Sequence, residues 1–216
     1  MSISSPTDWT RALPQCIVSQ IQDFSHVFDA VRTRGAARLF NEDLSDWETG
    51  QATTMERMFY GARRYNQPME LWNVSTVVNM SMMFLGAVSF NQQLDSWSVG
   101  AVRDISSMFA GAERYNQPIG SWNVTNVLDM SGMFLLAKDF NQSLIAWDIS
   151  SVSDMTSMFK GASAFDQNLC AWADRIGEST STDGMFELTG CPSQVDPVAA
   201  PIGKHVTSFC HACEST

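Results

Sequence analysis

Four cysteines near the end of the chain have a number and spacing that allow either disulfide bonds or a metal site. They are Cys170, Cys191, Cys210 and Cys213, and the last two form a C-x-x-C pair. A structural zinc site usually takes two such pairs. Only one pair is present, so disulfides are the favoured interpretation, and a four-cysteine zinc site or free thiols are the alternatives.

Four cysteines allow three pairings. We expect Cys170 to pair with Cys191 and Cys210 to pair with Cys213, which leaves Cys16 free. The first bond would close a loop of about 20 residues, worth roughly 3 kcal/mol in the chain-entropy model. Because disulfides persist in oxidising compartments, this interpretation predicts an extracellular or cell-surface protein.

A second set of chemically capable residues recurs every 25 positions: Asn79, Asp104, Asp129 and Asp154. Each stands just before an apolar segment with a spacing near three. The favoured interpretation is that each caps the N-terminus of a helical turn. The alternative is a column of carboxylates that bridges Ca²⁺.

No catalytic constellation accompanies these residues. The three histidines, at positions 26, 205 and 211, lie outside the repeated part of the chain. Motifs of the G-x-S-x-G, H-E-x-x-H or phosphate-loop type are absent from the sequence. We therefore predict that the protein is not an enzyme and that it uses no metal or other cofactor.

The composition and charge of the chain indicate which partners to expect. The 216 residues carry a net charge of −10, and an acidic chain without a basic stripe repels phosphates, so we expect no nucleic-acid partner. No apolar run approaches the roughly 20 residues of a membrane span. Charged residues interrupt the first 30 positions, so we also expect no signal peptide there.

The elements that must position these residues are set by a repeat. Six tryptophans recur at an interval of 25 without a slip: Trp47, Trp72, Trp97, Trp122, Trp147 and Trp172. The unit reads F-N-Q-x-L-x-x-W-x-V-x-x-V-x-x-M-x-x-M-F-x-G-A. A fixed period of this kind indicates a repeat architecture. One unit buries too little apolar surface to fold alone, so the units must stack.

Two periods coexist within the unit. Trp-x-Val alternates as in a short strand, and V-x-x-M-x-x-M-F has the spacing of a short helix or 3₁₀ turn. We therefore predict an α/β solenoid of strand-turn-helical-turn units over residues 40–172. A helical N-terminal cap is predicted over 1–39, and an irregular cysteine-containing cap over 173–216.

Two polar columns follow from this arrangement. The asparagines after the aromatic position are predicted to form a structural ladder between units: Asn41, Asn66, Asn91, Asn116 and Asn141. Residues beside Trp and Val on the strand point away from the core. They form a candidate ligand-binding strand face, here called the flank face: Asp46, Glu48, Asn73, Ser75, Ser98, Asn123, Thr125, Asp148 and Ser150. This surface is small and polar, so it is either solvated or docks a partner weakly.

N-glycosylation sequons begin at Asn73, Asn79, Asn123 and Asn141. A repeat rich in Asn, Ser and Thr generates this motif easily, so its specificity is low. Glycans on Asn73 and Asn123 would obstruct the flank face.

The repeat over residues 40–172 resembles the BspA-type bacterial surface repeat, also called DUF285 or the mycoplasma-lipoprotein-type leucine-rich repeat. The tail, with Cys170, Cys191-Pro192 and Phe209-Cys-His-Ala-Cys213, is similar to family members from diatoms and other marine algae. The resemblance implies a right-handed, leucine-rich-repeat-like solenoid. It also implies a surface or secreted protein used in adhesion and recognition, and it carries no catalytic residues.

The sequence thus predicts a non-catalytic recognition or adhesion module that binds a protein or glycan through the flank face. The alternative is a structural or assembly subunit of a larger surface coat or particle.

Overall fold

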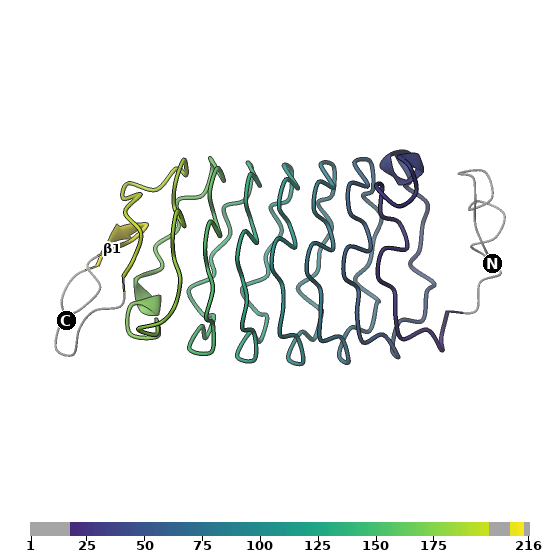
Figure 1. Ribbon diagram of the computed structural model, residues 1–216, viewed down its shortest axis with the longest axis horizontal. Helices are drawn as coiled ribbons and strands as arrows, with labels where there is room; N and C mark the ends of the chain where they lie inside the picture. The colour runs from purple at the N-terminus through teal and green to yellow at the C-terminus, as the bar shows by residue number, and fades with distance from the viewer. Residues whose placement is uncertain (1–17, 199–207, 214–216) are drawn as a thin grey trace.

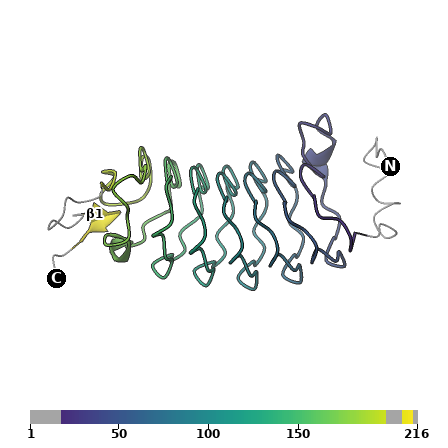
Figure 2. The ribbon, with the colours of Figure 1, turned by 60° about the horizontal axis from the view of Figure 1, so that its bottom comes forward.

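The computed structural model describes residues 18–198 and 208–213. Within them the chain runs as a row of coils that lie side by side along the long axis (Figure 1, Figure 2). Regular elements are short: the 3₁₀ helices η2 (Ala36–Leu39) and η3 (Cys170–Trp172), and the strands β1 (Ser208–Phe209) and β2 (His211–Ala212). The two strands pair antiparallel.

The predicted α/β solenoid of leucine-rich-repeat-like strand-turn-helical-turn units is therefore wrong. The described residues contain no α-helix, and within residues 40–172 they contain isolated bridges in place of strands. The Trp-x-Val segments, where strands were predicted, carry no bridge. The bridges run instead through one column, pairing successive coils in parallel: Asp23, Thr54, Asn79, Asp104, Asp129, Asp154 and Ser181.

Backbone hydrogen bonding in the predicted helical turn explains the difference. In residues 55–62, alternate N–H groups donate to the next coil: Met55 to Asn79, Arg57 to Ser81, Phe59 to Met83 and Gly61 to Leu85. The N–H groups of Met58, Tyr60 and Ala62 donate three residues back, as from Met58 to Met55. An α-helix needs every N–H bonded four residues back, so no helix forms. The left-handed φ of 54° at Arg57 interrupts it further.

The core lies inside the coils and consists of stacked columns of like side chains. Trp72, Trp97, Trp122, Trp147 and Trp172 are buried. Each of their indole N–H groups donates to a backbone carbonyl of the preceding coil, at 2.8–3.2 Å. A buried indole N–H needs such a partner. The repeat therefore supplies both the apolar stack and the acceptor that a tryptophan requires.

The predicted helical N-terminal cap is also wrong over its described part. Residues 18–35 form turns, and the chain up to residue 17 lies outside the described residues. Phe28 stacks on Phe59 and on Phe40, as Phe59 stacks on Phe84 and on Tyr65. Residues 18–40 are thus a further coil of the same design.

This first coil contains an insertion. Phe28 and Phe40 are 12 positions apart, whereas the equivalent Phe59 and Tyr65 are six positions apart. The six extra residues form the approach to η2, which stands out from the row of coils in Figure 2. They also interrupt the 25-residue period, so the sequence repeat does not reveal this first coil.

Candidate functional site

All nine residues of the flank face are exposed. They alternate with buried Trp and with buried Val, Ile or Thr positions, so their side chains leave the core on one side. The alternation of exposed and buried side chains agrees with the prediction. The backbone of these segments is irregular, however, so they are not strands. The face is therefore a set of exposed turns in register, one per coil.

Part of the polar capacity of this face is used internally. The Asn73 Oδ1 atom accepts hydrogen bonds from the backbone N–H and the hydroxyl of Ser75, and Asn123 does the same with Thr125. Hydrogen bonds from the Ser150 hydroxyl and backbone N–H hold the pKa of Asp148 below its ordinary value. These turns fix the side chains and leave the amide Nδ2 groups of the two asparagines for a partner.

The sequons differ in environment. Asn73 and Asn123 are exposed, whereas Asn79 and Asn141 are half-buried. The side chain of Asn79 binds the backbone N–H of Ser81, and that of Asn141 binds the backbone N–H of Asp166. All four side-chain oxygens thus accept a backbone N–H, and what distinguishes Asn73 and Asn123 is the exposure of their side chains.

The predicted ladder positions bond between neighbouring coils. The backbone N–H of Asn66 donates to Asn41 Oδ1 at 2.8 Å, and the same bond recurs at 2.8–3.0 Å from Asn91, Asn116, Asn141 and Asp166. A second set of hydrogen bonds accompanies this ladder and was not predicted from the sequence. In five coils a glutamine donates its Nε2 to the ladder asparagine of the preceding coil, as Gln92 does to Asn66; the donors are Gln67, Gln92, Gln117, Gln142 and Gln167.

The column of Asn79, Asp104, Asp129 and Asp154 does not cap helices, because no helix follows it. The side-chain oxygen of each accepts the backbone N–H two residues on, at 2.8–2.9 Å. Such Asx turns hold the chain at the bridge column.

One group of three residues within the described parts of the chain has metal-ligating atoms close together: Asp166, Cys210 and His211. The sulfur of Cys210 is committed to a disulfide. What remains is an ion pair between His211 Nε2 and Asp166 Oδ1 at 2.9 Å. The predicted four-cysteine zinc alternative is wrong, because all four of its cysteines form disulfides.

The four tail cysteines form two disulfides, but the predicted pairing is wrong. Cys170 bonds Cys213, and Cys191 bonds Cys210, with Cα–Cα distances of 5.4 and 4.9 Å. Cys210 occupies the tight turn between β1 and β2 with a φ of 64°, and it is buried. That turn directs Cys210 toward Cys191 and brings Cys213, beyond β2, to Cys170. Cys16 lies outside the described residues.

A buried charge cluster in the first coil was not foreseen from the sequence. The carboxylate of Asp29 is fully buried and accepts hydrogen bonds from His26 Nδ1 at 2.9 Å and Arg57 Nε at 3.0 Å. Backbone N–H groups of Val31 and Arg32 also donate to it. Burial raises the pKa of Asp29, but these hydrogen bonds outweigh it and bring the pKa below its ordinary value. The cluster therefore holds the start of the insertion.

Among the described residues, no helix has the length and apolarity needed to cross a membrane. A family model described as "Mycoplasma protein of unknown function, DUF285" matches residues 5–115 and 92–194. No curated protein and no solved structure matches the chain.

Proposed function

The chain belongs to the DUF285 family, and we propose that it is a non-catalytic recognition or adhesion module of the cell surface or extracellular space. In this proposal it binds a protein or glycan partner through the flank face. The observation that carries the proposal is the register of that face, whose exposed side chains recur once per coil along the row.

The packing beneath supports a rigid, extended docking surface. Trp122 stacks on Trp147, and Trp147 on Trp172, with ring centroids 6.5 and 6.4 Å apart. Each flank residue is directly adjacent in sequence to a Trp, Val or Ile side chain that packs in the core, of which Trp47 is partly buried. A surface held in this way loses little conformational entropy on binding, which favours affinity at low cost.

The charge clusters support a non-catalytic role. Asp29 is fully buried and bonded to four donors, out of reach of a substrate. The pair of His211 and Asp166 stands at the surface without a neighbouring nucleophile among the described residues, since the adjacent Cys210 is oxidised. Neither cluster has the nucleophile, base and oxyanion donors that a reaction would need.

Two disulfides support the proposed location. Disulfides are stable in oxidising compartments and rare in the cytosol. A protein that uses both to fix its last coil is suited to the cell exterior.

The test compares two double variants with equal charge change. Asn73→Arg with Asn123→Arg places bulk on the flank face, whereas Gln93→Arg with Ser143→Arg places it at exposed positions before the tryptophans. Both proteins and the wild type are applied to an array of glycans and immobilised extracellular-matrix proteins. Sedimentation velocity of each protein measures self-association.

We expect the flank-face variant to lose array binding and the other variant to keep it, with unchanged sedimentation. Equal binding by both variants would contradict the proposal. Loss of self-association in the flank-face variant, with no array binding by the wild type, would favour the assembly subunit.

A further inference from the structure

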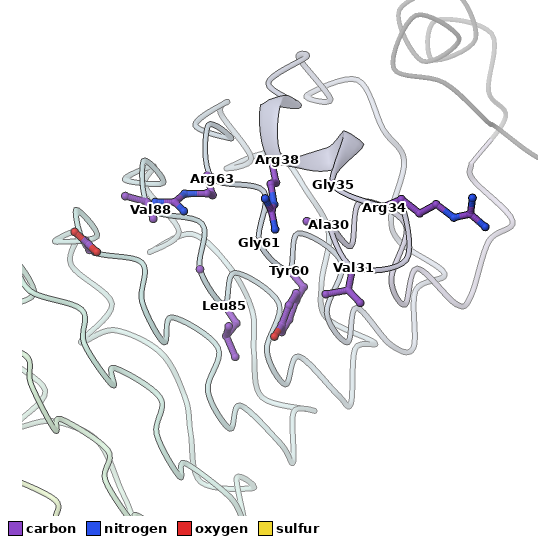
Figure 3. Close-up of a pocket in the computed structure, with 12 residues that line it drawn as sticks. Ala30, Val31, Arg34, Gly35, Arg38, Tyr60, Gly61, Arg63, Leu85 and Val88 are labelled. Carbon is purple, nitrogen blue, oxygen red and sulfur yellow. The ribbon is translucent and has the colours of Figure 1, made fainter.

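A groove lies beside the insertion in the first coil. The groove has a volume of about 700 Å³, and its lining comes from the first coil with its insertion and from the three coils that follow. In Figure 3, Arg38 reaches down toward Gly61 and Tyr60, and Arg63 runs along the margin toward Val88. Arg34 points away from the centre. The floor is formed by small or apolar residues such as Ala30, Gly61, Leu85 and Gly86.

The charge in this groove is positive and uncompensated. Arg34, Arg38 and Arg63 are exposed, and none of them has an ion pair with a described residue. The one acidic residue of the lining, Glu113, is paired with Lys138 at 3.0 Å. Arg38 and Arg63 thus bring two guanidinium groups without an ion pair to the groove, on a chain whose net charge is −10, while Arg34 points away from its centre.

The walls of the groove are held in place by the buried charge cluster. Asp29 fixes the backbone of Val31 and also binds Arg57, whose guanidinium carbon lies 3.8 Å from the centre of the Tyr60 ring. Thr33 continues this network, since its hydroxyl donates to the Asp29 carbonyl and accepts the backbone N–H of Ala37. The position of η2, and with it Arg38, is therefore set before any ligand arrives.

We propose that this groove binds an acidic sugar, with its carboxylate held by Arg38 and Arg63. Planar guanidinium groups match the geometry of a carboxylate and bind it with two parallel hydrogen bonds. The partly exposed ring of Tyr60 and the apolar floor at Leu85 and Val88 suit the apolar face of a pyranose ring. The volume suits a small ligand, because ligand pockets span about 300–1,000 Å³.

The net charge of the chain restricts the size of this ligand. An extended acidic polymer would lie along a surface of the same sign and be repelled. One sugar unit with one carboxylate interacts only with the local positive charge. No residue of the groove lining belongs to the flank face, so the two proposals are tested independently.

Isothermal titration calorimetry at low salt tests the proposal with three probes: sodium glucuronate, glucose and inorganic sulfate. The test variant is Arg38→Gln with Arg63→Gln. The control is Arg64→Gln with Arg114→Gln, two exposed arginines outside the groove lining. Thermal melting of each variant checks that folding is intact, which we expect because all four arginines are exposed.

We expect glucuronate to bind the wild type and the control with equal affinity, and the test variant at least tenfold more weakly. Glucose should show no measurable heat. Equal affinity of the test variant and the control for glucuronate would overturn the proposal. Sulfate binding as tightly as glucuronate would overturn it too, since the groove would then attract an adventitious ion only.

Discussion

The bridge column begins at Asp23 and ends at Ser181, and the coils at its two ends are secured by different chemistry. In the last coil, N–H groups that would donate to a next coil are bonded by side chains of the following segment. Gly184 donates to Asp196 at 2.7 Å, and Leu188 donates to Gln194 at 3.1 Å. Two disulfides then tie this segment down. In the first coil, hydrogen bonds to the buried carboxylate of Asp29 hold the chain in place.

The difference determines what each end responds to. A disulfide is insensitive to moderate acid but is broken by reductant. A buried carboxylate with cationic partners is insensitive to reductant but loses its charge in acid. The inner coils depend on neither and are held by the stacked apolar columns. The five predictions below separate these three modes of stabilisation, from the largest expected effect to the smallest.

The inner coils provide the reference. Changing Trp97 to Ala should cost about 3–5 kcal/mol of unfolding free energy, as for other large core deletions. The loss includes the stacked ring and the indole hydrogen bond to Met69. Trp47 is only partly buried and lies next to the first coil, so Trp47→Ala should cost less. Urea unfolding monitored by tyrosine and tryptophan fluorescence measures both, and equal small losses would contradict the stacked core.

At the C-terminal end, the two disulfides should differ modestly. They join residues 43 and 19 positions apart. In the chain-entropy model the Cys170–Cys213 bond is then worth about 4 kcal/mol and the Cys191–Cys210 bond about 3 kcal/mol. Double serine variants of each pair, unfolded in urea, measure these values. Non-reducing peptide mapping checks the pairing itself, and a Cys170–Cys191 peptide would refute it.

At the N-terminal end, Asp29→Asn should cost about 2 kcal/mol at neutral pH, since hydrogen bonds to charged groups are worth about 1.5–3 kcal/mol. The amide keeps the shape but loses the charge that binds Arg57 and His26. Asp43→Asn is the control, because that carboxylate is exposed. A loss at Asp43 as large as that at Asp29 would argue against a special role of the buried charge.

The same variant yields a pH dependence with a definite sign. The pKa of Asp29 is lowered in the folded protein, so its contribution is complete above the ordinary carboxyl pKa of about 4. That contribution declines as the pH falls through the lower, folded value. The difference in unfolding free energy between wild type and Asp29→Asn should therefore shrink as the pH falls from about 5 to about 2, a window that begins just above the ordinary carboxyl pKa. A gap that stays constant would show that the charge of Asp29 does not stabilise the insertion.

The smallest effect concerns two tyrosines in the aromatic column. The hydroxyls of Tyr65 and Tyr115 are buried without a hydrogen-bond partner, and burial raises the pKa of both. Equivalent positions carry phenylalanine, as at Phe90, so the column accepts that ring. Tyr65→Phe should raise stability by about 1 kcal/mol, because an unsatisfied buried hydroxyl is unfavourable. The reverse change, Phe90→Tyr, should lower it, and a gain from both changes would contradict this explanation.

The regular part of the molecule was readable from the sequence because each coil repeats the same burial. The interval of 25 placed Trp97 in the core and Asn73 on the exposed side. The backbone was not readable, because a spacing near three fits a helical turn as well as the observed alternation of N–H partners. Phe59 occupies the same position in either pattern, so side-chain burial does not distinguish them.

The irregular parts were missed for separate reasons. Six inserted residues place Phe28 out of phase with Phe59, so the apolar spacing of the first coil resembles that of a helix. The cysteine pairing depends on a segment that leaves Cys191 and returns through β1, where Phe209 packs edge-on against Trp172. No local pattern specifies that return. The arginine groove likewise arises from residues brought together only by the insertion.

Hydrogen–deuterium exchange of the native protein, with and without reductant, tests most directly whether the two ends are secured by different chemistry. We predict that reduction at neutral pH speeds exchange in residues 165–198 and 208–213, and leaves residues 18–62 and the inner coils protected. Faster exchange in residues 18–62, or a uniform loss of protection along the row, would contradict the account.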